Sequence, residues 1–339
     1  MGFKMNPDPI IWALIDERPG TGNQCKGVAM ALKAPFIEKK LIWSQLGLLP
    51  NFLIQTSLIG LRDASKRTIG SPWPELVIAS GRRAANVARY IKRKNPKKCH
   101  LVQIMHPGYS NIDEFDLIAI PNHDIGVPDR KNFLRIMGVP HSIDNDRLVE
   151  AEKQWIAKFS NLKRPVIGLI VGGATKRRAF NKSMAIELAN QTAKMVHDTN
   201  GSLVITTSPR TGDCIDYLLD CLFSKKIAPS FVHRWRSNEL LIENPYLGIL
   251  AHADHLIVTG ESTTMCSEAC GTGKPVHIFA PNNFLIEKHQ YFIDDLVKNG
   301  HAYFLDNGLI RPSMQRTGIK LDTAAFLAEE IRGRILFNA

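Results

Sequence analysis

Short apolar runs recur along the whole chain, separated by polar turns and by segments with a helical spacing of apolar residues. Runs of this length that end at glycine or polar residues predict buried strands. The predicted strands are Ile10–Ile15, Leu76–Ser80, Cys99–Met105, Phe115–Ile120, Val166–Val171, Ser202–Thr207, Phe231–Trp235, His255–Thr259 and Val276–Phe279. Strands that alternate with helices favour an α/β fold with parallel sheets.

Helical patterns follow most of these strands. The predicted helices are Gly27–Leu32, part of Trp43–Leu61, a helix that starts at Gly81, Leu148–Phe159, Lys182–Thr199, Cys214–Phe223, Glu243–Ala253, a helix capped by Ser262 or Thr263 that ends at Ala269, and Thr323–Leu336. Hydroxyl side chains are favoured caps because they accept from the unpaired amides of a first helical turn.

The length of 339 residues favours two domains, because single cores stop growing near roughly 250–300 residues. A polar stretch from Ser160 to Pro165 is the candidate linker. We therefore predict two Rossmann-like domains facing a cleft, residues 1–160 and 161–339, with the last helix a candidate to pack back on the N-terminal domain. One long doubly wound domain is the alternative.

Positive charge is concentrated in the first half of the chain. The net charge is +11, and residues 1–158 hold 23 Lys and Arg against 15 Asp and Glu. Much of the excess lies in Arg82-Arg83 and in the run from Arg89 to Lys98, which contains one aromatic residue and matches no nucleic-acid motif. We therefore expect no nucleic acid partner. An anionic membrane surface is a candidate partner for this face, and a solvated helix face is the alternative.

Several absences suggest a cytoplasmic protein, and the basic face makes peripheral attachment to the inner face of the membrane a candidate. No apolar run reaches the ~18 residues of a membrane span, and the N-terminus lacks the apolar core of a signal peptide. The six cysteines form no metal-binding pattern, so reduced and mostly buried thiols are expected.

The stretch His255–Phe279 combines a strand, a hydroxyl-lined turn and a helix N-terminus. Backbone N–H groups and the helix dipole converge at such a turn, which makes it a candidate anion site. Glu261 lies at its start, and Glu268 lies in the helix where its carboxylate could bind a sugar diol. Lys274 is expected to cap the end of that helix.

Other loops of the second half could bind a nucleotide. In Gly172–Lys176, two glycines would let the backbone approach a diphosphate, although a tight turn with a solvated lysine is the alternative. Arg210 could clamp a phosphate or form a surface salt bridge, and Asn244 with Tyr246 could border a base or simply start a helix. The predicted donor-binding residues are Gly172, Gly173, Ala174, Thr175, Lys176, Ser208, Arg210, Asn244, Tyr246, Glu261, Ser262, Thr263, Thr264 and Glu268.

The first half supplies candidate bases and a second anion-ready edge. Asp16, His106, His123 and Asp124 follow predicted strands and could accept a proton from an acceptor hydroxyl, although a lone histidine is more often structural. The residues predicted for the acceptor or phosphate side are Arg18, Gly20, Asn23, Gln24, Ser80, Gly81, Arg82 and Arg83.

No metal-ligand set is apparent in the sequence. Asp144-Asn145-Asp146 matches the DxD triplet of metal-dependent sugar transferases of another fold, but it precedes a helix, so capping by Asp144 or Asn145 is favoured. We expect no metal and no other cofactor.

These motifs together resemble the elongated-mitochondria fission family, known from plants, whose bacterial relatives are assigned to the glycosyltransferases. The resemblance covers most of the chain. Its markers are Asp16-Glu-Arg-Pro-Gly20 with Asn23-Gln24, Ser80–Arg83, Pro121–Asp124, Gly172–Ala174, Thr206–Ser208, Glu243–Tyr246, Glu261–Ala269 and Thr272–Val276. The chain departs from the family at Glu17, where glycine is more usual, and at Ala174-Thr175, where serines are more usual.

The resemblance implies a GT-B fold and, for the bacterial branch, sugar transfer from a nucleotide sugar to a cell-envelope glycolipid such as a lipooligosaccharide core. For the plant branch it implies recruitment of division machinery at the mitochondrial surface. The leading hypothesis is a metal-independent GT-B glycosyltransferase with a nucleotide-sugar donor and a glycolipid acceptor. A non-catalytic membrane-surface adaptor and a nucleotide-sugar epimerase are the alternatives.

Overall fold

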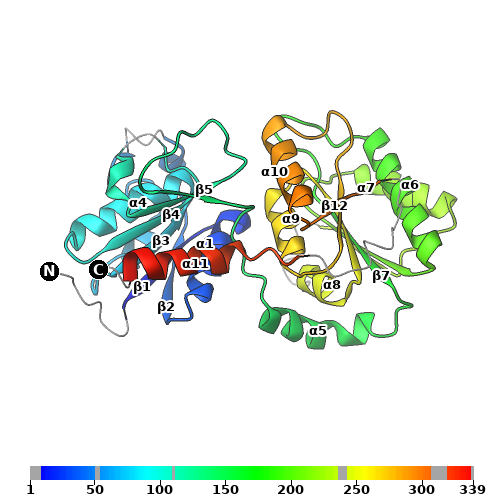
Figure 1. Cartoon of the computed structure of the whole chain (residues 1–339), viewed down its shortest axis with the longest axis horizontal. Coiled ribbons are helices and arrows are strands. Elements are labelled where there is room, and N and C mark those ends of the chain that lie inside the picture. The colour runs from blue at the N-terminus through cyan, green and yellow to red at the C-terminus, as the bar shows by residue number, and fades with distance from the viewer. Residues whose placement is uncertain (1–8, 50–53, 109–110, 236–242, 307–318, 337–339) are drawn as a thin grey trace. The chain divides into compact units, whose positions relative to one another are not determined.

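The computed structural model describes residues 9–49, 54–108, 111–235, 243–306 and 319–336 (Figure 1). The chain divides into two compact units. Unit 1 comprises residues 1–142 and 322–339, and unit 2 comprises residues 143–321. Each unit contains a parallel six-stranded sheet with helices packed on it, which confirms the predicted α/β fold with two Rossmann-like halves.

The sheet of unit 1 has the strand order β2-β1-β3-β4-β5-β6. Its strands are β1 (Ile11–Asp16), β2 (Phe36–Leu41), β3 (Leu76–Ser80), β4 (His100–Ile104), β5 (Leu117–Pro121) and β6 (Phe133–Ile136). The helical segments are α1 (Pro19–Ala31), η1 (Gln45–Leu48), α3 (Asp63–Arg67), α4 (Gly81–Lys94), η2 (Ile112–Glu114), α11 (Thr323–Ile331) and η4 (Arg332–Leu336).

The sheet of unit 2 has the order β12-β11-β10-β7-β8-β9. Its strands are β7 (Val166–Val171), β8 (Ser202–Thr207), β9 (Phe231–His233), β10 (His255–Thr259), β11 (Val276–Phe279) and β12 (Tyr303–Phe304). Its helices are α5 (Asn145–Phe159), α6 (Lys182–Thr199), α7 (Cys214–Ser224), α8 (Tyr246–His252), α9 (Thr263–Cys270) and α10 (Glu287–Lys298).

Strand order locates one switch point in each sheet. The chain progresses in opposite directions on the two sides of the β1/β3 pair in unit 1 and of the β7/β10 pair in unit 2. Loops at the carboxyl ends of such a pair diverge to opposite faces of the sheet and leave a crevice where ligands of open α/β folds bind. The strand order therefore predicts that ligands bind at the loops after β1 and β3 in unit 1 and after β7 and β10 in unit 2.

The division between the units differs from the predicted boundary at residue 160. Helix α5 lies in unit 2, where Trp155 and Phe159 form a cluster with Val166 and Ile249. Gly248 of α8 faces this cluster, and a Cβ there would lie 2.3 Å from Trp155 Cγ. At the other end of the chain, α11 packs on α1 in unit 1.

Three strands were absent from the sequence prediction, namely β2, β6 and β12. Strand β2 lies at the sheet edge, where Ile37 is 47% exposed. Because an edge strand is partly open to solvent, the β2 sequence FIEKKL contains charged residues and no continuous apolar run. Trp43–Leu61, expected to be partly helical, contains η1, and an antiparallel bridge joins Trp43 to Leu61. Residues 50–53 of this segment lie outside the described residues. No helix among the described residues is both long and apolar enough to cross a membrane.

Two buried histidines pair near the amino-terminal edge of the second sheet. His255 Nδ1 lies 3.3 Å from His277 Nε2, and the ring of Tyr303 lies beside His277. Burial lowers the pKa of His277 to about 3 and also lowers the pKa of His255. The folded protein therefore holds both rings neutral.

This pair predicts acid sensitivity. Because the folded pKa of His277 lies below the ordinary value of 6.5, protonation favours the unfolded chain, and stability is lost as pH falls from about 6.5 toward 3. Urea unfolding should show His277 lowering the free energy of unfolding by about 2 kcal/mol between pH 7 and pH 5. His277→Phe should reduce this loss, whereas the exposed His197→Phe should not. Equal acid loss in all three proteins would contradict the prediction.

Candidate functional site

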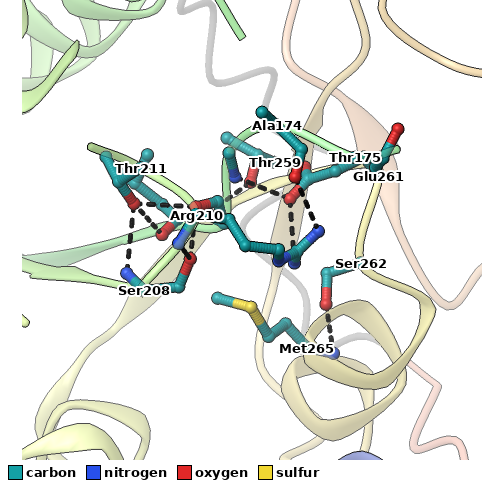
Figure 2. A network of polar contacts seen from close by, with 12 residues as sticks. Ala174, Thr175, Ser208, Arg210, Thr211, Thr259, Glu261, Ser262 and Met265 are labelled. Atoms are coloured by element: carbon teal, nitrogen blue, oxygen red, sulfur yellow. Dashed lines mark hydrogen bonds and ion pairs between the residues drawn. The ribbon is translucent and has the colours of Figure 1, made fainter. Parts of the chain in front are cut away.

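Three loops of unit 2 meet at the carboxyl ends of β7, β8 and β10 (Figure 2). The loop after β7 is joined to the loop after β8 by a hydrogen bond from Ala174 N–H to the Arg210 carbonyl, 3.0 Å long. The Thr211 hydroxyl donates to the Gly172 carbonyl at 2.7 Å, and the Ser208 hydroxyl donates to the same carbonyl. These contacts fix the two loops against each other beside the switch point.

Glu261, in the loop after β10, is the charged group at the centre of this network. Its Oε1 accepts a hydrogen bond from Gly173 N–H at 2.7 Å and lies 3.2 Å from Arg210 Nη2. The Glu261 side chain is fully buried, while that of Arg210 is 39% exposed. The site therefore presents its cation to solvent and keeps its anion inside.

The protonation of Glu261 reflects opposing effects. Burial raises the pKa of this carboxyl to about 7, against the lowering effects of Arg210, the Thr259 hydroxyl and the Gly173 amide. The second oxygen, Oε2, is buried and has no hydrogen-bond partner among the described residues. The pKa of Glu261 thus lies near neutral pH, and its Oε2 atom has no hydrogen-bond donor among the described residues.

The two glycines of the β7 loop are required by these contacts. A Cβ at Gly172 would lie 1.9 Å from Glu261 Oε1, and one at Gly173 would lie 2.2 Å from the Arg210 carbonyl oxygen. Gly173 also has φ +130°, which side chains rarely adopt. The sequence predicted glycine here for close approach of a ligand, but in the structure both glycines make room for other parts of the protein.

The remaining residues of the β7 loop form a closed turn. The Thr175 hydroxyl accepts from Arg178 N–H at 3.0 Å, and Thr175 N–H donates to the Arg178 carbonyl at 2.8 Å. Lys176 is exposed on this turn. The structure therefore gives Thr175 a local structural role and leaves Lys176 at the surface.

The helix after Glu261 begins as the sequence predicted. Ser262 is its N-cap and accepts from Met265 N–H at 3.5 Å, so Thr263 and Thr264 are the first helical residues. Cys266 and Cys270, on the inner face of α9, are buried as expected, and burial raises the pKa of both thiols. The turn thus has the geometry of an anion-binding helix start.

Glu268, further along α9, is paired with Tyr246 of α8. The Tyr246 hydroxyl donates to Glu268 Oε2 at 2.7 Å, and Tyr246 N–H donates to Asn244 Oδ1 at 3.0 Å. Burial and the neighbouring Glu268 raise the pKa of Tyr246 well above its ordinary value, so the hydroxyl remains a donor. Three residues predicted separately for the base and ribose are therefore in one hydrogen-bonded chain.

Lys274 caps a different helix from the one predicted. Its Nζ donates to the Leu250 carbonyl at 2.8 Å and to the Ala251 carbonyl, so it caps the C-terminus of α8, not of α9. Burial lowers the pKa of this ammonium to about 8. The sequence could not show this because the two partners are more than twenty residues apart.

The switch point of unit 1 is organised around Asp16. Its carboxylate accepts from Arg18 N–H and Trp43 Nε1–H, both at 2.9 Å, and from Arg83 Nη2 at 3.0 and 3.1 Å. The Arg83 guanidinium also lies over the Trp43 ring, 4.8 Å from its centroid. A carboxylate with so many donors fits a structural anchor better than the predicted base.

The other predicted residues of this edge lie in the same two loops. The Ser80 hydroxyl donates to Gln24 Oε1 at 2.7 Å, and both side chains are buried. Gly81 has φ +74° and starts α4 directly after β3, whereas Arg18 and Arg82 are exposed. Gly20 and Asn23 lie in the first turns of α1. Trp43 was not predicted to contribute, because it stands in a mostly apolar stretch and its partner Asp16 lies 27 residues away.

Two of the predicted bases differ in accessibility. His106 follows β4 and is partly buried; its Nδ1 accepts from Gly108 N–H at 3.2 Å, and burial lowers its pKa below 6.5. His123, after β5, is 4% exposed. Asp124 is half-buried and raises the pKa of His106 slightly against the effect of burial.

Much of the predicted basic face is neutralised within unit 1. Arg89 lies 2.7 Å and Arg93 lies 3.5 Å from Glu114, while Lys92 lies 2.8 Å from Asp116. The run on α4 is therefore a weaker candidate for membrane contact than its sequence indicates.

The DxD triplet has the predicted capping role. Asp144 is the N-cap of α5 and accepts from Arg147 N–H at 2.8 Å. Within the described ranges, no group of three or more histidine, cysteine or acidic side chains could hold a metal ion.

Comparison with solved structures supports the fold. The chain superposes on UDP-GlcNAc 2-epimerase from Neisseria meningitidis, solved with UDP-GlcNAc bound, with a TM-score of 0.55 and 13% identity. The match covers 97% of this chain and 100% of the epimerase. The corresponding enzyme of Methanocaldococcus jannaschii gives a TM-score of 0.51 at 12% identity, covering 97% and 99%. The architecture is thus GT-B-like.

Comparison of sequences identifies the family. The chain is 30% identical over 330 residues to an uncharacterised protein of Rickettsia prowazekii, covering 88% of this chain and 91% of the relative. It is 27% identical over 247 residues to mitochondrial fission protein ELM1 of Arabidopsis thaliana, covering 67% of this chain and 56% of the plant protein. The family model of mitochondrial fission ELM1 matches residues 19–335. The resemblance predicted from the motifs is therefore confirmed, and the chain belongs to the mitochondrial fission ELM1 family.

Proposed function

We propose that this protein is a metal-independent GT-B glycosyltransferase that transfers a sugar from a nucleotide-sugar donor to a cell-envelope glycolipid. The observation that carries the proposal is that Arg210 contacts Glu261 beside the start of α9, the helix that also carries the Glu268 carboxylate paired with Tyr246. A guanidinium and a helix N-terminus suit a diphosphate, because both stabilise negative charge that develops on a departing phosphate. A buried carboxylate suits a ribose diol.

The diphosphate and the ribose of the donor each have candidate partners in unit 2. Arg210, Ser262, Thr263 and Thr264 are assigned to the diphosphate, since they lie around the β10–α9 turn. Glu268 is assigned to the ribose, with Tyr246 orienting its carboxylate through the 2.7 Å hydrogen bond. Positive charge and backbone dipoles would stabilise the leaving group without a metal.

The ribose assignment predicts a selective loss of binding. Glu268→Ala should weaken UDP binding by roughly 10- to 150-fold, the equivalent of about 1.5–3 kcal/mol for hydrogen bonds to a charged group. The same substitution should leave binding of inorganic pyrophosphate unchanged, because pyrophosphate has no ribose. Titration calorimetry with both ligands tests this, and Glu187→Ala on the exposed part of α6 is the control. An equal loss for both ligands would argue against the ribose role.

Among the predicted bases, His106 suits proton transfer best. Burial lowers its pKa, so the imidazole is neutral and able to accept a proton at neutral pH. His106→Gln should lower the turnover rate by about 10²- to 10⁴-fold and leave the affinity for UDP unaltered. The rate of UDP release with donor and acceptor is the measurement. If His123→Gln gives the larger loss, the role belongs to His123 instead.

An apolar patch of unit 1 offers a surface for the lipid part of an acceptor. The exposed side chains Leu46 (48%), Leu48 (68%) and Ile59 (54%) lie on two segments held together by a hydrogen bond from Ser44 N–H to the Gly60 carbonyl. The exposed cation Arg67 at the end of the following helix, α3, adds attraction for anionic headgroups. We propose this patch, and not the paired face of α4, as the principal membrane contact.

The membrane assignment predicts the effect of a double substitution. Leu46→Ser with Leu48→Ser should weaken binding to vesicles containing phosphatidylglycerol by roughly thirtyfold, because each buried leucine contributes on the order of 1 kcal/mol at partial insertion. Co-sedimentation is the measurement, and Ile156→Ser, a 53% exposed apolar residue of α5, is the control. Vesicle binding that neither the double variant nor the charge of the lipid alters would contradict the assignment.

The adaptor alternative is favoured by the name of the Arabidopsis relative, a mitochondrial fission protein. Incubation of the nucleotide-sugar donor with and without a glycolipid acceptor distinguishes the transferase, epimerase and adaptor hypotheses. Release of UDP that requires acceptor supports the transferase, and conversion of the donor alone supports an epimerase. Binding of lipid with no turnover of any nucleotide sugar supports the adaptor.

A further inference from the structure

The two oxygens of Glu261 have different surroundings. Oε1 accepts from Gly173 N–H and faces Arg210 Nη2, whereas buried Oε2 has no hydrogen-bond partner among the described residues. A charged oxygen that is removed from water and given no donor is strongly disfavoured. The arrangement therefore favours a second state in which Oε2 gains a partner.

Arg210 connects this carboxylate with the solvent. Its guanidinium contacts Glu261 on one side, donates weakly to the Ala174 carbonyl at 3.5 Å, and remains 39% exposed. An anion that arrives from solution would therefore meet a guanidinium already engaged by the protein's own anion. Two negative groups would then share one cation, which raises the energy of an ionised Glu261.

We propose that Glu261 is the internal anion of the diphosphate site and takes up one proton when a diphosphate binds Arg210. This inference rests on the proposed donor site. The proton comes from water or buffer and forms an O–H bond at Oε2, with no other bond made or broken. The carboxylate loses its charge, and Arg210 is released to the diphosphate.

The neighbouring titratable groups do not compete for this proton. Arg210 faces Glu261 from the β8–α7 loop, and Cys266 faces it from α9 with a pKa raised well above 9.0 by burial, Cys270 and Glu261. On α10, His289 lies near Arg210, and burial, Lys288 and Arg210 all lower the pKa of His289. Between pH 7 and pH 8.5 the thiol stays protonated and His289 stays neutral, so Glu261 is the group that changes charge.

The experiment measures proton uptake during UDP binding by calorimetry at pH 8 in two buffers of different ionisation enthalpy. Uptake close to one proton per UDP is expected, because Glu261 is mostly ionised at pH 8 before binding and protonated after it. The Kd for UDP should rise by roughly tenfold per pH unit between 7.5 and 8.5. The terminal phosphate of UDP, with a pKa of about 6, does not titrate in this range.

Two variants and a control isolate the source of the proton. Glu261→Gln should bind UDP with no proton uptake and no pH dependence, while the exposed Asp213→Asn beside the same loop should behave as the unmodified protein. If Glu261→Gln fails to fold, Arg210→Met replaces it and should bind weakly with little uptake, because Glu261 is then protonated before UDP arrives. Binding of UDP without proton uptake in the unmodified protein overturns this inference and leaves the donor site standing. Failure of both UDP and pyrophosphate to bind overturns both.

Discussion

The buried carboxylate of Glu261 is the constraint on which the second half of the molecule depends. Its contact with Gly173 N–H requires a residue without a side chain at Gly172, and its contact with Arg210 requires the β8 loop to close over the β7 loop. Each of these loops is then fixed by further hydrogen bonds from Ser208 and Thr211. An ion pair of this kind is held by its neighbours and adds little net stability itself, because desolvation offsets most of the attraction.

Unit 1 also has a buried carboxylate at its switch point, but that carboxylate is fully hydrogen-bonded. Asp16 also lies at a switch point and also faces an arginine, but both of its oxygens accept hydrogen bonds, and Trp43 covers the guanidinium of Arg83. The Asp16 carboxylate therefore has no oxygen left without a donor. The carboxylate of unit 1 is thus fully paired, whereas that of unit 2 keeps one oxygen without a hydrogen-bond partner among the described residues.

The sequence was most informative where burial alone decides structure. Strands β7, β8 and β10 were predicted with their observed bounds, because strands covered on both faces have nearly continuous apolar sequence. Edge strand β2 was missed because water reaches one of its faces. Glu261 was recognised as part of a polar turn, but its contact with Gly173 spans 88 residues, and no local pattern encodes a partner so distant. The sequence likewise could not show that Glu261 and the Arg210 carbonyl crowd Gly172 and Gly173, because both neighbours are distant along the chain.

Lys274 has a consequence for how α8 and α9 are joined. The hydrogen bond between Tyr246 and Glu268 joins the first turn of α8 to the interior of α9, and Lys274, in the segment after α9, holds the last carbonyls of α8. Hydrogen bonds thus hold α8 at both of its ends. Between these ends, Gly248 of α8 packs closely against Trp155 of α5. A ligand that shifts Glu268 would therefore displace α8 together with α9, because these hydrogen bonds join the two helices.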